Sequence, residues 1–228
     1  MRIAGRGARI QAGLFTKNLM GKSAISVLFL GKARDWHVDR AVAYCGRNFD
    51  SLQVFLGDWG DPPPAALTEA RPGCIISYLS RWIVPQSTLG TVKHAINFHP
   101  GPPEYPGYGC NNFAVYDGAS QFGTTCHHMA PQIDTGPIIA VARFPVLPDD
   151  TGGTLLLRTY DYQLVLFYDV VGRLLRGEDL PAAPDRWGRQ PFTRKQFTAL
   201  GQITPEMGEA EVARRRKAVD VSALQNRG

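Results

Sequence analysis

Short apolar runs alternate along the chain with longer stretches in which apolar residues recur every three or four positions. Six of the short runs have the length and composition of buried strands: 24–31, 51–57, 74–80, 94–100, 122–129 and 138–146. Amphipathic helices are predicted at 33–49 and 111–119, a short turn or helix at 86–92, and a long helix that starts after the capping sequence Asp-Asp-Thr and ends near 177. This alternation predicts an α/β fold that is Rossmann-like, with a mostly parallel twisted sheet flanked by helices.

The composition fits a globular protein divided into three parts. The 228 residues are 44% hydrophobic and 20% charged, and no apolar run approaches the ~20 residues of a membrane span. We expect a leader at 1–22 that is basic and disordered, one folded domain at 23–200, and a helical tail at 201–228. The predicted protein is soluble and cytoplasmic, without a membrane partner.

The positive charge is confined to the leader. Residues 1–22 contain five basic residues and no acidic one, so the remaining 20 Lys and Arg balance the 20 Asp and Glu. A neutral body argues against a nucleic-acid partner. The leader itself has the composition of an organelle presequence. A plain extension, or a true start at Met20, is the simpler interpretation, and organelle targeting is the alternative.

Several kinds of chemistry lose support from missing motifs. The first strand-to-helix turn, FLGKARDW, contains neither the dinucleotide fingerprint nor a P-loop. The cysteines are scattered, which predicts free thiols in a reducing compartment. Cys126, His128 and the nearby Cys110 suggest zinc, but their spacing matches no zinc motif and His127 points to the other strand face, so we predict no metal.

The candidate chemistry lies where the fourth predicted strand ends. Alternation along HAINFHP places Asn97 and His99 on one face, and Pro100 fixes the histidine at the start of an irregular loop. Ligands of parallel α/β sheets bind at the carboxyl ends of the strands. Asp134 lies in a second loop, APQIDTG. A structural histidine and a turn-capping aspartate are the simpler interpretations, but an amide, an imidazole and a carboxylate at one sheet edge form a set suited to proton transfer.

These motifs resemble a known family. Asn-x-His-Pro in INFHPGPPEYPGYG, followed 35 residues after the histidine by Asp134 in IDTGPII, is similar to the formyltransferases that use 10-formyltetrahydrofolate. That family includes methionyl-tRNA formyltransferase, glycinamide ribonucleotide formyltransferase and the sugar N-formyltransferases. The resemblance extends from about Ile75 to Ile139. The family's Ser-Leu-Leu-Pro after the histidine is replaced here by Pro-Gly-Pro-Pro, which leaves the contacts of that loop open.

The resemblance implies roles for individual residues. Asn97 and a protonated His99 would donate hydrogen bonds to the formyl oxygen, and Asp134 would raise the pKa of His99 and help to move the proton. 10-Formyltetrahydrofolate would be the co-substrate, with no metal. Its pterin would be bound by the cofactor-binding residues Ser80, Arg81, Trp82, Ile83, Met129, Gln132 and Ile133. The acceptor would be bound by Tyr105, Gly107, Trp187 and Arg189.

The acceptor amine is predicted by elimination within the family. The neutral body and the short basic tail after Leu200 disfavour tRNA, and FLGKARDW lacks the phosphate loop of the purine enzyme. DRWGRQPFTRKQF resembles the aromatic and basic stretch of sugar N-formyltransferases, although it is equally typical of a strand or loop that covers the core. A nucleotide-linked amino sugar is therefore the predicted small-molecule partner. Methionyl-tRNA, another small amine, a non-catalytic folate-binding module and a homodimer remain open alternatives.

Overall fold

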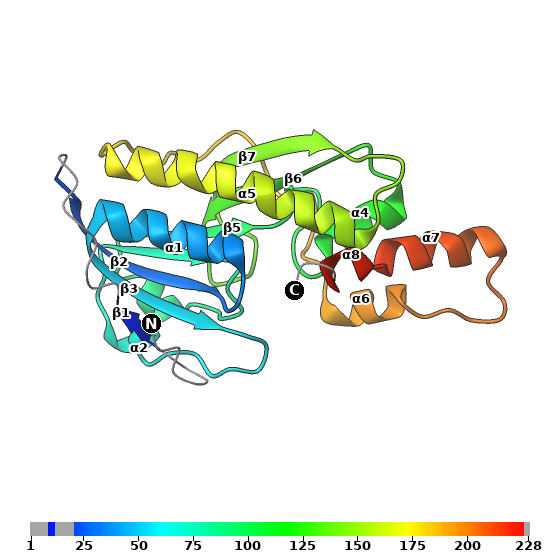
Figure 1. The fold of residues 1–228 in the computed structure, drawn as a ribbon, viewed down its shortest axis with the longest axis horizontal. Coiled ribbons are helices and arrows are strands. Elements are labelled where there is room, and N and C mark those ends of the chain that lie inside the picture. Colours follow the sequence, from blue (N-terminus) through cyan, green and yellow to red (C-terminus); the bar gives the residue numbers. More distant parts are fainter. Residues whose placement is uncertain (1–8, 12–20, 226–228) are drawn as a thin grey trace.

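The computed structural model describes residues 9–11 and 21–225, which form the α/β fold shown in Figure 1. The strands are β1 (Arg9–Gln11), β2 (Ser23–Lys32), β3 (Phe49–Gly57), β4 (Cys74–Tyr78), β5 (His94–His99), β6 (Gln121–His128) and β7 (Ile138–Pro145). The helices are α1 (Trp36–Asn48), α2 (Ala66–Glu69), α3 (Gln86–Leu89), α4 (Cys110–Asp117), α5 (Gly152–Leu175), α6 (Arg194–Leu200), α7 (Glu209–Val219) and α8 (Ser222–Gln225).

All the described strands belong to one sheet, in the order β1-β3-β2-β4-β5-β6-β7. The strands β3, β2, β4 and β5 are parallel to one another, whereas β6 and β7 continue the sheet in antiparallel orientation and β1 pairs antiparallel with β3. The predicted α/β fold with a mostly parallel sheet is therefore confirmed for its centre. The turn from parallel to antiparallel pairing occurs at β5, which carries Asn97 and His99.

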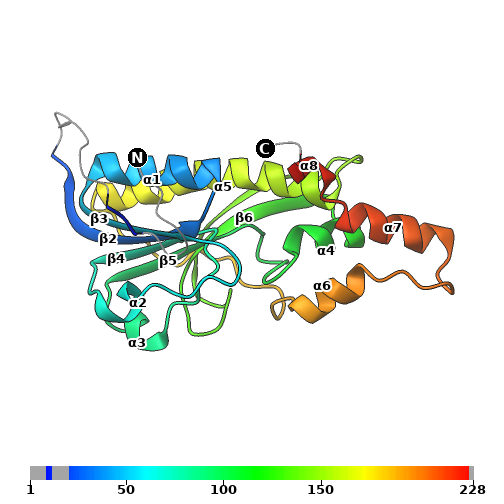
Figure 2. The same ribbon diagram turned by 60° about the horizontal axis from the view of Figure 1, so that its bottom comes forward.

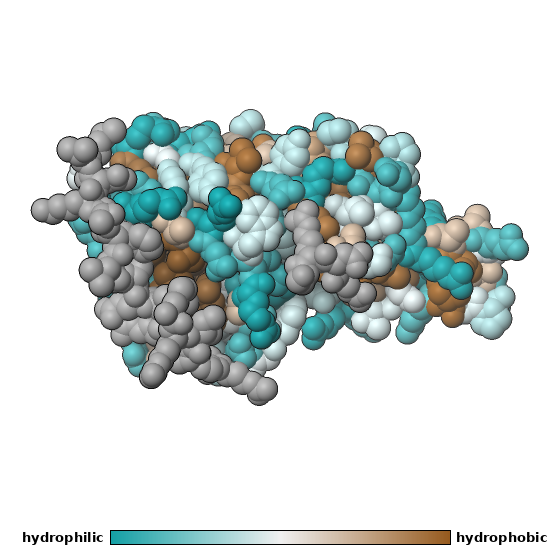
Figure 3. Space-filling view, viewed as in Figure 1, coloured by the Kyte–Doolittle hydropathy of each residue, from teal (hydrophilic) through white to brown (hydrophobic). Residues whose placement is uncertain are grey.

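Helices cover both faces of the sheet because the parallel strands are apolar on both sides. Along β2, Val27 and Phe29 point into the cluster under α1 and α5, whereas Leu28 and Leu30 join the cluster that includes Leu67 of α2. Figure 2 shows α1 and α5 on one side of the sheet, with α2 and α3 on the other. A third apolar cluster joins α4, α6 and α7 to the β6–β7 end. Apolar residues on the face in Figure 3 form separate groups rather than one band.

Local sequence signals explain where the two long helices begin. Asp35 caps α1 by accepting hydrogen bonds from the backbone N–H groups of His37 and Val38. Thr151 and Thr154 form a capping box at the start of α5, as the Asp-Asp-Thr sequence predicts. A similar box, Thr193 with Gln196, starts α6. This helix is not among the predicted elements, although its capping residues Thr193 and Gln196 can be read in the sequence.

The structure bears on the remaining predictions as follows. Of the leader, 1–8 and 12–20 lie outside the described residues, while Arg9–Gln11 forms β1. All four cysteines are free and buried, as predicted. The helix α7 lies in the predicted helical tail. Across residues 9–11 and 21–225, no helix is long and apolar enough to cross a membrane.

Candidate active site

Two neighbouring cavities open at the carboxyl ends of the central strands. Cavity 1 has a volume of about 500 Å³ and lies between the loop after β4 and the loop that joins β6 to β7. Cavity 2 has a volume of about 300 Å³ and lies between the loop after β4 and the helices α4 to α6. Asn97 and Asp134 line both cavities. The place that the sequence predicts for chemistry is thus the place where the two cavities meet.

The predicted polar residues come together in space. The His99 Nδ1 lies 3.1 Å from the Asp134 Oδ2, and both side chains are about 5% exposed. The same carboxylate oxygen accepts a hydrogen bond of 2.8 Å from the backbone N–H of Gly107. Gly107 has φ = 88°, and a Cβ there would lie 2.4 Å from the backbone of Phe192, so only glycine brings its N–H to this point. The loop that departs from the family pattern therefore holds the carboxylate.

Asp134 itself has a left-handed backbone conformation, with φ = 50°. This conformation is uncommon outside glycine, but aspartate and asparagine adopt it more readily than other residues. Two positions later, a Cβ on Gly136 would lie 1.8 Å from the carbonyl oxygen of His128. The tight Ile-Asp-Thr-Gly loop is thus fixed by its close approach to β6, and it aims the carboxylate back at the end of β5.

Electrostatics make His99 and Asp134 an ion pair. Burial alone would lower the pKa of His99, but the charge and hydrogen bond of Asp134 outweigh it and raise this pKa well above its ordinary value. Burial likewise opposes ionisation of Asp134, yet the charge and hydrogen bond of His99 hold the pKa of its carboxyl well below the usual range. The second ring nitrogen, His99 Nε2, donates to the Tyr105 carbonyl oxygen at 3.1 Å. Both N–H groups of an imidazolium are thus satisfied within the protein.

His127 is a buried site residue to which the sequence assigns no role, because alternation along the strand places it on the face opposite Cys126 and His128. Its Nε2 lies 3.1 Å from the Asn97 Nδ2 and 3.4 Å from the Asp134 Oδ1, and its Nδ1 lies 2.8 Å from the His128 carbonyl oxygen. With Nδ1–H donating to that carbonyl, Nε2 accepts one amide proton of Asn97. The second amide proton remains available to a ligand in cavity 1. The strand register places Asn97 opposite His127, which the sequence does not reveal.

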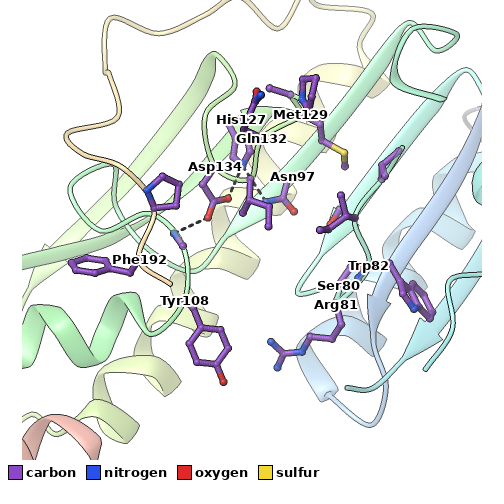
Figure 4. Close-up of a pocket in the computed structure, with 18 of the residues that line it drawn as sticks. Ser80, Arg81, Trp82, Asn97, Tyr108, His127, Met129, Gln132, Asp134 and Phe192 are labelled. Carbon is purple, nitrogen blue, oxygen red and sulfur yellow. Dashed lines mark hydrogen bonds and ion pairs between the residues drawn. The ribbon is translucent and has the colours of Figure 1, made fainter. Parts of the chain in front are cut away.

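The residues predicted to hold a pterin all line cavity 1. They come from both of its walls: Ser80, Arg81, Trp82, Ile83, Met129, Gln132 and Ile133. Figure 4 shows Ser80, Arg81 and Trp82 on one side of this cavity and Asp134 of the β6–β7 loop on the other, with Asn97 between them. Ile83 and Ile133 are apolar yet 64% and 54% exposed. Apolar walls and a few fixed polar groups are the usual lining of a small-molecule site.

The residues predicted to hold the acceptor are placed differently from one another. Gly107 lines both cavities, whereas Tyr105 packs against Phe192 and reaches the site through its carbonyl group. Trp187 lies behind the cluster, edge-on to the rings of His99 and His127, and its indole N–H donates to the Gly136 carbonyl oxygen at 2.8 Å. Arg189 lies over the Phe192 ring at 3.8 Å. Neither Trp187 nor Arg189 lines the two cavities.

The cysteine and histidine side chains at the end of β6 have structural contacts within the protein. Cys126 is buried in the main core, and the His128 Nε2 donates to the Leu180 carbonyl oxygen at 2.8 Å. Within the part of the chain that the structure describes, no group of three or more His, Cys, Asp or Glu residues is arranged to hold a metal ion.

Comparisons with known proteins show which family this chain is similar to. Residues 65–171 match the family model described as formyl transferase. The chain is 31% identical over 108 residues to the methionyl-tRNA formyltransferase of Listeria monocytogenes, a match that covers 46% of this chain and 35% of that protein. The chain thus spans about a third of the length of this curated relative.

Solved structures match over most of the chain. A Mycobacterium tuberculosis protein described as a candidate sugar N-formyltransferase superposes with a TM-score of 0.73 at 22% identity, covering 87% of this chain and 88% of that one. The N-formyltransferase of Helicobacter canadensis, in complex with folinic acid and dTDP-3-aminofucose, superposes with a TM-score of 0.68 at 19% identity, covering 85% and 80%. At these identities the matches establish the fold.

Proposed function

We propose that the chain, whose residues 65–171 match the formyl transferase family model, transfers the formyl group of 10-formyltetrahydrofolate to a primary amine. The observation that carries the proposal is the carboxylate of Asp134. It is buried between His99 and His127, fixed by the backbone of Gly107, and lines two adjoining cavities. One cavity then takes the donor and the other the amine.

Cavity 1 suits the donor. Its volume of about 500 Å³ is of the size that holds drug-sized ligands. The predicted pterin residues line its two facing loops, where backbone N–H and C=O groups can pair with the edge of a flat heterocycle. When bound, the folate supplies an activated formyl carbon. The residues of the chain then bind and orient the folate, stabilise the negative charge on the formyl oxygen and help to move the proton of the amine.

The mechanism follows from one free donor, Asn97, and one positive charge, His99, close to the place where the two cavities meet. Asn97 keeps one amide proton free while His127 holds the other, so the amide is oriented before the substrate arrives. The positive charge of His99, maintained by Asp134, stabilises negative charge that develops on the formyl oxygen. A donor of this kind is worth about 3 kcal/mol in the transition state. The proton lost by the attacking amine would pass through water to the departing nitrogen, with the Asp134 carboxylate stabilising the positive charge that develops on the amine.

The acceptor that we propose is an amino sugar linked to a nucleotide. The Helicobacter canadensis N-formyltransferase carries such a ligand, dTDP-3-aminofucose, on a similar fold. Most basic side chains of the tail, which a tRNA would need as phosphate contacts, already interact within the protein. Arg214 and Arg215 both pair with Glu211, and Lys217 donates to the Pro148 carbonyl oxygen. Methionyl-tRNA remains the second candidate acceptor, because the relatives found by sequence are named methionyl-tRNA formyltransferases.

A mass-spectrometric assay tests the proposal. The full chain is incubated with 10-formyltetrahydrofolate and a panel of nucleotide-linked amino sugars, and each product is examined for the mass gain of one formyl group. We expect transfer to at least one amino sugar and none with Asp134→Asn. Transfer to methionyl-tRNA alone would select the second candidate. Stoichiometric binding of folinic acid without transfer to any amine would instead indicate a folate-binding module.

A further inference from the structure

One cluster at the mouth of the cavities has no role in the mechanism described above beyond the place of Arg81 in the wall of cavity 1. The indole of Trp59, in the loop after β3, is 54% exposed and lines both cavities. The guanidinium carbon of Arg81 lies 4.5 Å from the centre of its ring, and that of Arg194 lies 4.9 Å from it. Arg194 also lies 5.6 Å from the ring of Tyr108. Three segments far apart in the sequence thus bring two cations to one aromatic surface.

Within the described ranges, these two arginines lack an acidic partner, unlike several arginines elsewhere in the fold. Arg143, Arg158 and Arg173 pair with Glu104, Asp150 and Asp169. Among the residues that the structure describes, neither Arg81 nor Arg194 forms an ion pair. Among the described residues, Asp134 is the one carboxylate that lines either cavity, and its Oδ2 is engaged by His99 and by the backbone N–H of Gly107.

The position of the cluster connects it to ligand binding. Arg194 and Thr193 lie at the end of cavity 1 that is formed by the Pro191–Arg194 segment, while Arg81 also lines cavity 2. Figure 4 shows Arg81 and Tyr108 extending toward the opening from opposite walls, with the Asn97–Asp134 floor between and behind them. The aromatic rings restrict the two guanidinium groups, so that little side-chain entropy is lost when an anion binds.

We infer that Trp59, Arg81 and Arg194 form an anion-binding subsite, which holds the negatively charged group of a ligand seated in the adjoining cavities. The inference rests on the proposed folate-dependent transfer, because that reaction supplies two anionic ligands. The donor ends in the carboxylates of a glutamate, and a nucleotide-linked acceptor carries a diphosphate. Carboxylate and phosphate present the same chemistry to a guanidinium group, namely paired charge-assisted hydrogen bonds.

Direct binding separates the two sources of charge. Wild type, Arg194→Ala, Arg81→Ala and the matched control Lys195→Ala are titrated by calorimetry with folinic acid, with the same folate lacking its glutamate, and with inorganic pyrophosphate. Lys195 neighbours Arg194 on α6, carries the same charge, and lines neither cavity. Thermal unfolding of each variant verifies that it is folded.

Two results support the subsite. If the subsite holds the donor, Arg194→Ala and Arg81→Ala lower the affinity for folinic acid about tenfold or more. The compound without glutamate then binds to wild type and to the variants with the same affinity. If it holds the acceptor, the affinity for folinic acid is unchanged, and pyrophosphate binds wild type and Lys195→Ala but neither arginine variant. Equal affinities in all four proteins for every probe would overturn the subsite.

The failure of the proposed function has a different signature. If wild type does not bind folinic acid, the folate proposal fails, and the pyrophosphate titration alone decides whether the subsite exists. If folinic acid binds equally well to all four proteins, the folate proposal stands and the subsite is refuted unless pyrophosphate distinguishes the arginine variants.

Discussion

Two buried histidines at the carboxyl edge of the sheet have carboxylate partners, yet the fold uses them differently. His37 lies after β2, between the Asp35 Oδ1 at 3.2 Å and the Asp161 Oδ1 at 3.0 Å. His99 lies at the end of β5, beside Asp134 at 3.1 Å. Both rings are almost completely buried, with 2% and 4% of their surface exposed. Burial and a carboxylate partner therefore do not distinguish a structural histidine from a reactive one.

The difference lies in what each carboxylate does and where it faces. Asp35 caps α1, and Asp161 is on α5, so the His37 group joins two helices. Burial opposes ionisation of Asp35, but hydrogen bonds from His37 and Lys32 lower its pKa to about 2. None of these residues lines cavity 1 or cavity 2, whereas Asp134 lines both. We therefore assign a chemical role to the His99–Asp134 cluster, which reaches the cavities, and a structural role to the His37 cluster, which does not.

Asp134→Asn should give the largest effect. Asparagine tolerates the left-handed backbone and can still accept from Gly107, but it no longer raises the pKa of His99. We expect kcat for the acceptor identified in the panel to fall about 10²- to 10⁴-fold, as for the loss of a general acid–base group. Rapid-quench or steady-state assays measure this, and circular dichroism serves as the folding control. A variant with near-normal turnover would remove Asp134 from the mechanism.

The buried pair should also shape the pH dependence of stability. The pKa of His99 is raised, so its contribution is full below the ordinary value of 6.5 and is lost as the pH rises through the raised pKa. The pKa of Asp134 is lowered, so its contribution is full above 3.8 and is lost as the pH falls toward the lowered pKa. The difference in unfolding free energy between wild type and His99→Gln should therefore be largest between pH 3.8 and 6.5, about 3–5 kcal/mol. Urea titrations across the pH range measure it, and a constant difference would contradict the pairing.

Asp35→Ala tests the structural cluster. Loss of the cap costs about 1 kcal/mol, and the buried His37 loses one partner, so the unfolding free energy should fall by about 2 kcal/mol. Formyl transfer should keep its kcat, because no residue of this cluster lines the cavities. Asp35→Asn is the matched control, since asparagine caps helices as well as aspartate does. A large loss of kcat with intact stability would show that the two clusters are coupled.

His127→Gln should sharpen the division of labour inside the reactive cluster. Glutamine removes the ring that holds one amide proton of Asn97, so the amide loses its fixed orientation. We expect kcat to fall about tenfold, with KM for the folate little changed, because a positioning residue acts on the transition state more than on binding. Both changes act through the same amide, so the double variant Asn97→Ala/His127→Gln should have the same kcat as Asn97→Ala alone. Additive losses in the double variant would contradict this coupling.

How much of this could be predicted depends on how local each signal is. The strands follow from continuous apolar runs, and α5 follows from its capping sequence. Asn97 and His99 follow from alternation within one strand. His127 and Trp59 cannot be predicted as site residues from local sequence. His127 reaches the site through the pairing of β5 with β6, and Trp59 lies in a loop whose path has no periodic pattern. Residues brought together by long-range pairing are the ones that local pattern leaves out.

Trp187→Phe should produce the smallest effect and addresses a residue that the sequence assigns to the acceptor. The indole packs edge-on against His99 and His127, and its N–H bond to Gly136 anchors the loop that carries Asp134. Phenylalanine keeps the aromatic wall and loses that bond, which should lower the unfolding free energy by about 1 kcal/mol. Since Trp187 lines neither cavity, KM for the acceptor should be unchanged while kcat falls by no more than about threefold, through a looser Asp134 loop. A marked rise in the acceptor KM with unchanged stability would mean that the indole contacts the acceptor, and the wall behind the histidines would then be part of the binding site.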